Sequence, residues 1–169
     1  MNDNRFHIMF VCMGNICRSP LAHGIFQRLV NEAGLGHLIT VESSGTVSSH
    51  IGELPDPRMR EEAERHGMIL DHRARQIETE DIDRYDLILG MDRTNVMHVK
   101  SLGKRGFSPR SHIKLFRTFD PEGGGEVPDP YYGGPEGFSV VYSMVERTCR
   151  RLLDVVSSTY LKKAEERNA

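Results

Sequence analysis

Apolar residues follow two alternating patterns along the chain. Short apolar runs, typical of strands buried in a parallel sheet, occur at residues 6–12, 37–43, 85–91 and 112–116. Apolar residues at helical spacing fill the segments that follow, at about 20–34, 57–67, 92–102 and 138–163. Strands that alternate with helices predict an α/β fold: a three-layer αβα arrangement with a central four-stranded parallel sheet, formed as a single domain over residues 1–169.

The junction after the first strand carries clear turn and helix signals. Gly14 and Asn15 predict a turn, and Ser19 and Pro20 then predict a helix with a hydroxyl at its N-cap and proline at its first position. Asp92 is predicted to cap a later helix in the same way. Ligands of parallel sheets bind beyond the carboxyl ends of the strands. The turn after the first strand is therefore a candidate binding site.

Composition and charge narrow the class of protein. The chain is 38% hydrophobic and 27% charged, as in ordinary globular proteins, and its net charge of −2 with scattered basic residues gives no reason to expect a nucleic-acid partner. We expect no signal peptide and no membrane association, since no apolar stretch approaches the ~20 residues of a membrane span. Three cysteines are too few for a disulfide scaffold, which favours a cytoplasmic protein. Cys149 lies on the apolar stripe of the last helix and is expected in the core.

The stretch "VCMGNICRSP", residues 11–20, combines groups suited to oxyanion chemistry. Backbone N–H groups at a helix start attract anions, and the planar fork of Arg18 matches two oxygens of a phosphate. The same positive surroundings favour the thiolate of Cys12, which would then be a nucleophile facing the bound group. A lone cysteine in such a turn is usually structural. The combination of cysteine, five residues, arginine and serine at a strand-to-helix junction is much more specific.

Two cysteines so close together also raise the question of a metal. Four ligands with zinc-like spacing are absent from the sequence, and no His-x-x-x-His pair stands near Cys12 and Cys17. We therefore expect no metal site, and we expect the other histidines to be surface or packing residues.

Several motifs together resemble one known family. The segment "CMGNICRSPLA" resembles the signature of the low-molecular-weight protein tyrosine phosphatases, and "DPYY" at residues 129–132 resembles that family's acid loop. The motifs "SSGT", "PDPR", "HRARQ" and "GMDRTN" follow the family's order and approximate spacing. The resemblance implies hydrolysis of phosphotyrosine and aryl phosphates through a phosphocysteine intermediate, without a metal or other cofactor. It implies a phosphotyrosine-containing protein as substrate, and phosphate or another oxyanion as an active-site ligand.

The resemblance also implies roles for individual residues. Cys12 would attack phosphorus, Arg18 would bind the phosphoryl oxygens, and Asp129 would act as general acid and then as base. Ser19 would form a hydrogen bond to the Cys12 sulfur. Asp129, taken alone, would fit an ordinary proline-framed turn, and the two tyrosines after it would fit packing roles. The implied substrate-binding residues are Met13, Gly14, Asn15, Ile16, Cys17, Ser19, Ser49, His50, Tyr131 and Tyr132.

Two further expectations concern the support and protection of the loop. Family members hold the residue matching Asn15 in an unusual backbone conformation, and its matching polar partners here would be Ser44 and His72. The thiol matching Cys17 can form a reversible disulfide with the nucleophile, which would give redox control through Cys12 and Cys17. Alternatively, Cys17 has no redox role and is a small side chain that fills space in the loop.

The chain departs from the family at two positions. Many members carry an aromatic residue in the loop after "SGT", where this chain has Ser49 or His50, so stacking on an aryl phosphate would be weaker. His23 stands where an acidic residue is common.

Other activities on the same fold remain as alternatives. Relatives that act on phosphoarginine carry a threonine where this chain has Ile16, and arsenate reductases need additional cysteines that are absent between Arg18 and Cys149. A non-catalytic phosphate-binding module and a peroxide-sensing switch are the remaining alternatives. The oligomeric state is expected to be a monomer or a weak dimer.

Overall fold

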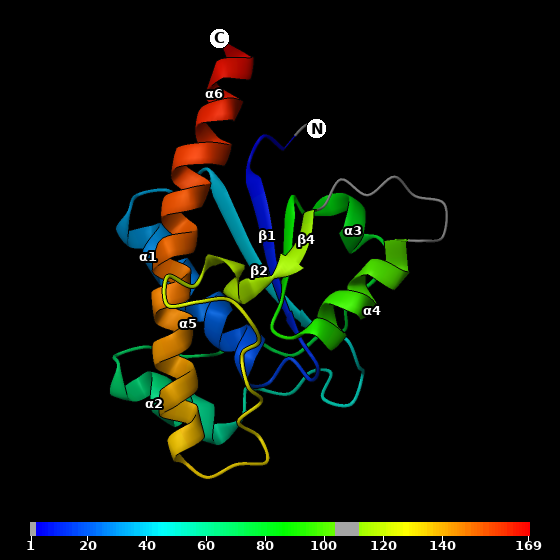
Figure 1. Ribbon diagram of the computed structural model, residues 1–169, viewed down its shortest axis with the longest axis vertical. Helices are drawn as coiled ribbons and strands as arrows, with labels where there is room; N and C mark the ends of the chain where they lie inside the picture. Colours follow the sequence, from blue (N-terminus) through cyan, green and yellow to red (C-terminus); the bar gives the residue numbers. More distant parts are fainter. Residues whose placement is uncertain (1–2, 104–111) are drawn as a thin grey trace.

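The computed structural model describes residues 3–103 and 112–169, and its centre is a four-stranded sheet (Figure 1). The strands are β1 (Phe6–Cys12), β2 (Ile39–Gly45), β3 (Leu87–Gly90) and β4 (His112–Leu115). They are hydrogen-bonded in the order β2-β1-β3-β4, and all the pairs are parallel. The predicted parallel α/β architecture is confirmed.

Helices cover both faces of the sheet, because side chains along β1 alternate between two apolar clusters. Ile8 and Phe10 belong to a large core with the helices α1 (Arg18–Glu32), α2 (Pro57–Arg65) and α5 (Glu136–Val155). Met9 and Val11 belong to a smaller core that includes residues from α3 (Asp81–Arg84) and α4 (Arg93–Gly103). In Figure 1, α5 and α1 lie on one side of the strands, whereas α3 and α4 lie on the other.

Several helix boundaries differ from the predictions. The helix α1 begins at Arg18, and its N-cap is Cys17, which makes no side-chain capping bond; Ser19 is therefore not the cap. The helix predicted over 138–163 is α5, which continues through a π-helical turn (Val156–Leu161) into α6 (Lys162–Asn168). The short helix α3 and a 3₁₀ turn (Phe116–Phe119) were not predicted, since single turns leave almost no periodic signal.

Two expectations, the capping role of Asp92 and the burial of Cys149, are confirmed. Asp92 accepts the Asn95 N–H at 2.8 Å and so caps α4, and Cys149 is fully buried in the large core. Within the described ranges, no helix combines the length and the apolar character that crossing a membrane requires.

Candidate active site

The loop from Cys12 to Arg18, called here the cysteine loop, leaves the carboxyl end of β1 and enters α1. Its carbonyls are held by the segment that follows β2: Thr46 donates to the Cys12 carbonyl at 3.0 Å and Val47 to the Met13 carbonyl at 3.1 Å. Gly45 makes this approach possible, because a β-carbon at that position would lie only 2.7 Å from the Met13 carbonyl oxygen. The cysteine loop is therefore seated on the end of β2.

Cys12 is 3% exposed, and two polar groups point at its sulfur. The backbone N–H of Asn15 donates to the sulfur at 3.3 Å, and the Ser19 hydroxyl lies 3.0 Å away. Ser19 also lies 3.3 Å from the Ser44 carbonyl, to which its hydroxyl can donate. The single Ser19 proton can serve the carbonyl when Cys12 is a thiol and the sulfur when Cys12 is a thiolate.

Asn15 organises the back of the loop. Its φ is 57°, and among the described residues it alone combines a side chain with a positive φ. Its amide nitrogen donates to the hydroxyls of Ser19 at 2.7 Å and Ser43 at 3.1 Å. Its amide oxygen accepts the Arg75 N–H at 3.0 Å and lies 3.3 Å from Nε2 of His72. These contacts hold a fully buried residue in a conformation that L-residues rarely adopt.

The expectation that Ser44 supports Asn15 is wrong, whereas His72 lies where it was expected. The Asn15 amide meets the hydroxyl of Ser43, and the Ser44 hydroxyl points instead to the Met9 sulfur at 3.1 Å. The reason is the two-residue period of a strand, which sends Ser43 and Ser44 to opposite faces of β2. Ser44 contributes its backbone carbonyl to Ser19 instead.

Arg18 is buried and held by one side of its guanidinium group. Nη1 donates to Asp92 at 2.8 Å and to the Val127 carbonyl at 3.0 Å, and Nη2 lies 3.5 Å from Asp129. Burial opposes the charge of Arg18, but the nearby Cys12, Asp92 and Asp129 outweigh it, so its pKa is raised. Within residues 3–103 and 112–169, Nε has no hydrogen-bond partner and Nη2 has only the long contact to Asp129, so an oxyanion that displaces this contact can bind Nε and Nη2 together.

A cleft of about 180 Å³ opens over the cysteine loop, and most of the expected substrate-binding residues line it. The lining residues are Cys12, Met13, Gly14, Ile16, Cys17, Arg18, Ser49, His50, Asp129, Tyr131 and Tyr132. Asn15 and Ser19 lie behind the cysteine loop instead and touch the Cys12 sulfur. The cleft thus brings the candidate nucleophile, the arginine fork and the candidate acid together.

The walls of the cleft come from two segments. On one side, the His50 ring packs against Gly14, where an added β-carbon would lie 3.0 Å from the imidazole. Nδ1 of His50 lies 2.6 Å from the Glu53 carboxylate, which orients the ring. On the other side, Tyr131 and Tyr132 meet edge to face with centroids 4.9 Å apart. The guanidinium of Arg58 lies 5.3 Å from the Tyr131 ring centroid. The imidazole of His50 therefore forms the part of the wall where many family members carry a larger aromatic side chain.

Cys12 and Cys17 both line the cleft, and both are free thiols in the structure. Burial, and then the negative charge of Asp56, raise the pKa of the Cys17 thiol. Cys17 therefore stays protonated at neutral pH, which separates it chemically from a nucleophile.

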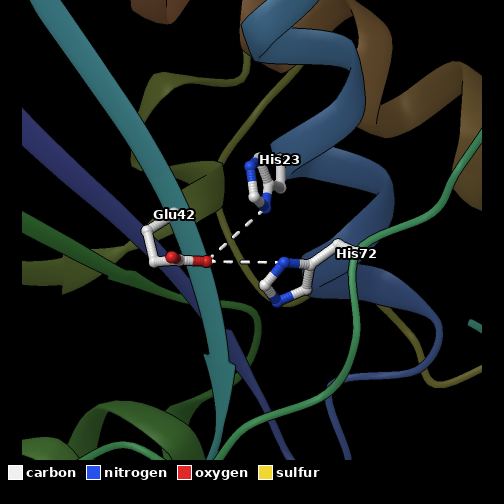
Figure 2. Close-up of side chains that lie close together, drawn as sticks. All are labelled: His23, Glu42 and His72. Atoms are coloured by element: carbon white, nitrogen blue, oxygen red, sulfur yellow. Dashed lines mark ion pairs between the residues drawn. The ribbon is translucent and has the colours of Figure 1, made fainter. Parts of the chain in front are cut away.

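Sequence reasoning missed several residues at the site. Asp92 was predicted only as a cap, but one of its oxygens caps α4 while the other holds Arg18. The partner roles of Ser43 and Arg58 were also missed, although the motifs "SSGT" and "PDPR" contain them. A third omission is a cluster of His23, Glu42 and His72 behind the loop, which Figure 2 shows.

Comparisons with known proteins agree with this geometry. The sequence profile of the family "Low molecular weight phosphotyrosine protein phosphatase" matches residues 7–166. A low molecular weight protein-tyrosine-phosphatase of Streptomyces coelicolor is 41% identical over 156 residues, which cover 89% of this chain and 93% of the relative.

Two solved structures share the fold. A protein tyrosine phosphatase of Entamoeba histolytica, crystallised with Hepes in its active site, has a TM-score of 0.83 and 31% identity, over 90% of this chain and 97% of the other. A Drosophila arginine phosphatase has a TM-score of 0.84 and 30% identity, over 90% of this chain and 98% of the other. With its cysteine loop, fold and sequence all in agreement, the chain belongs to the low molecular weight phosphotyrosine protein phosphatase family.

Proposed function

We propose that this chain is a metal-independent protein tyrosine phosphatase in which Cys12, Arg18 and Asp129 carry the reaction. The supporting observation is that Cys12, Arg18 and Asp129 line one cleft, with Nη2 of Arg18 only 3.5 Å from the Asp129 carboxyl group. The Arg18 fork and the N–H groups of residues 13–18 bind the three phosphoryl oxygens. The Cys12 thiolate then faces phosphorus opposite the leaving group.

The reaction proceeds in two displacement steps. In the first, Cys12 forms a bond to phosphorus while the ester P–O bond breaks, and Asp129 gives its proton to the departing phenolic oxygen. In the second, Asp129 takes a proton from water, whose oxygen attacks phosphorus and displaces the Cys12 thiolate as phosphate leaves. The Ser19 hydroxyl donates a hydrogen bond to the departing thiolate sulfur, and it donates to the Ser44 carbonyl when Cys12 is a thiol.

The substrate class is phosphotyrosine rather than phosphoarginine. Relatives with the latter activity carry a threonine at the position of Ile16, an apolar residue that lines the cleft here. Tyr131 and Tyr132 form an aromatic wall suited to a phenyl ring. A phosphotyrosine peptide should therefore be hydrolysed in strong preference to the same peptide carrying phosphoarginine.

Redox protection is a second part of the proposal. Cys17 lines the same cleft as Cys12, so it is placed to trap an oxidised Cys12 as a disulfide: the Cys17 sulfur attacks the sulfur of the Cys12 sulfenic acid, and the Cys17 proton leaves with the sulfenic hydroxyl as water. A reducing cytoplasm would then restore both thiols. Peroxide should inactivate wild type reversibly, and the Cys17→Ser variant irreversibly, when each is treated with a thiol afterwards.

The test of the proposed function is hydrolysis of an aryl phosphate across pH with EDTA present. Wild type should be active, the Cys12→Ser variant should lose more than about 10⁴-fold in kcat, and Asp129→Asn should lose about 10²–10⁴-fold. Quenching the reaction in acid should trap phosphate on sulfur in wild type and Asp129→Asn only.

Two results would count against the proposal. Folded, reduced wild type with no activity but with phosphate binding would favour a non-catalytic binding module. An active Cys12→Ser variant would exclude the phosphocysteine intermediate.

A further inference from the structure

The cluster behind the cysteine loop joins three elements that are distant in sequence. His23 comes from α1, Glu42 from β2, and His72 from the segment after α2, and Figure 2 shows the three side chains converging on one point. Their donor atoms all lie within 4.8 Å of one another. Among the described residues, the lining of the active-site cleft includes none of the three.

The distances fit a divalent transition-metal ion with little adjustment. Nδ1 of His72 lies 3.5 Å and Nδ1 of His23 lies 3.9 Å from Oε1 of Glu42. Tetrahedral Zn²⁺ with ligands at about 2.0–2.2 Å separates its donor atoms by roughly 3.3–3.6 Å. Small side-chain rotations would therefore close the cluster around an ion. Two imidazoles and one carboxylate form a ligand set that zinc sites use, with water as the fourth ligand.

The surroundings of the cluster also suit a metal site. Metal-bound imidazoles usually donate their second N–H to a fixed acceptor, and Nε2 of His72 faces the Asn15 amide oxygen at 3.3 Å. Oε1 of Glu42 is oriented by the Ser43 N–H at 2.9 Å. Nδ1 of His23 rests 3.1 Å from the Ser43 hydroxyl, which it would exchange for the ion.

An ion can reach the cluster from solvent. The three side chains are 18–31% exposed, which leaves a path from solvent.

We propose that His23, Glu42 and His72 bind a divalent transition-metal ion of the zinc class, and that the ion rigidifies the cysteine loop from behind. The ion fixes the His72 ring with its proton on Nε2, so that His72 donates to Asn15 and strengthens the contacts that hold Asn15 at φ 57°. It takes no part in the phosphoryl transfer.

The test is calorimetric titration of zinc chloride into the Cys12→Ser variant, which removes the competing nucleophilic thiolate. We expect one equivalent to bind and the midpoint of thermal unfolding to rise with zinc concentration. Adding His23→Gln or Glu42→Gln should weaken binding by more than the roughly 10–100-fold that loss of a supporting contact costs. The matched control His37→Gln changes an exposed histidine elsewhere and should leave binding unchanged.

X-ray absorption at the zinc edge gives an answer that needs no variant in the cluster. The proposal predicts two imidazole ligands, oxygen ligands and no sulfur. A sulfur ligand would assign the ion to Cys17, and equal affinity with and without His23→Gln would place it elsewhere; either result overturns the proposal, as does the absence of saturable binding.

Discussion

The two sides of the active-site cleft differ in how firmly the structure holds them. On the side of the cysteine loop, Cys12, Asn15 and Arg18 are at most 3% exposed and are fixed by hydrogen bonds to β2, to Arg75 and to Asp92. On the opposite side, Tyr131 is 38% and Tyr132 is 84% exposed. Within the described part of the chain, Asp129 has only a 3.1 Å bond from the Tyr131 N–H and the long contact to Arg18.

The difference matches what each side has to bind. Every phosphate monoester presents the same phosphoryl group, so the donors aimed at it gain from a fixed arrangement in a buried site. Leaving groups differ, and an exposed wall can meet them without a fixed geometry. The segment just before this wall is nevertheless fixed. The Val127 N–H donates to the Met91 carbonyl at 2.8 Å, and the Val127 carbonyl accepts from Arg18. Rigid support thus ends just before Asp129.

The comparison predicts the largest effect at Gly45, where the cysteine loop rests on β2. In Gly45→Ala the new β-carbon meets backbone atoms of Met13 and Gly14 at 2.7 and 3.1 Å, so the loop itself must move. We expect kcat/KM to fall by about 10²-fold or more, with about 1–3 kcal/mol lost from the free energy of unfolding. Kinetics with an aryl phosphate and urea denaturation measure both.

Gly36→Ala is the matched control, since among the described residues its β-carbon would meet only the Asn31 side chain, at an ordinary contact distance of 3.6 Å. It should leave activity unchanged. If Gly45→Ala kept wild-type kinetics, the active conformation of the cysteine loop would not depend on its close contact with Gly45, and the proposed rigidity would be wrong.

Sequence reasoning captured the features that repeat. The run at residues 6–12 coincides with β1, because a strand buried on both faces must be apolar throughout. The loop chemistry was also accessible, since Cys12 and Arg18 act within one short segment. Contacts between distant segments were not predicted. Asp92 and Arg18 are 74 residues apart in the sequence. His23, Glu42 and His72 meet only when α1, β2 and the segment after α2 pack together.

The Ser44 error shows a finer limit. Sequence similarity points to the pair Ser43–Ser44, but only the register of β2 decides which hydroxyl faces Asn15. One residue of offset changes the face of the sheet. A motif therefore locates a functional segment more reliably than it assigns roles to adjacent side chains.

The next effect concerns Asn15, and two variants divide it into its parts. Asn15→Gly removes the side-chain hydrogen bonds but tolerates φ 57°, whereas Asn15→Ala removes the same bonds and also strains the backbone. We expect Asn15→Ala to cost about 2–4 kcal/mol of unfolding free energy and Asn15→Gly about 1–2 kcal/mol less than that. Denaturation curves for the pair measure the difference, and equal losses would show that the backbone conformation is not strained.

A smaller effect is expected at Asp120, which anchors the chain ahead of the exposed wall. Burial opposes its charge, but hydrogen bonds from Arg147, the Glu122 N–H and Arg117 outweigh it and lower the pKa of Asp120 to about 2. A carboxyl whose pKa is lower in the folded state stabilises the fold above pH ~4 and loses that contribution as pH falls toward 2. Asp120→Asn should therefore cost about 2 kcal/mol at pH 7.

The Asp120→Asn variant should also unfold with a weaker dependence on pH between about 4 and 2. Thermal unfolding across that range measures it, and Asp154→Asn at an exposed position is the control. If Asp120→Asn left the free energy of unfolding at pH 7 unchanged, the hydrogen bonds of Asp120 would not stabilise the segment before the exposed wall.

The smallest effect is expected at Tyr132, the most exposed part of the wall. Tyr132→Ala removes an aromatic surface but no fixed hydrogen bond, so unfolding free energy should change by no more than about 0.5 kcal/mol. The KM for an aryl phosphate should rise by about two- to tenfold with kcat nearly constant, because stacking contributes to ground-state and transition-state binding alike. Tyr132→Phe should keep the wild-type KM, since it retains the ring. A fall in kcat with unchanged KM would mean that Tyr132 acts through the position of Asp129, and that the exposed wall is as organised for catalysis as the cysteine loop.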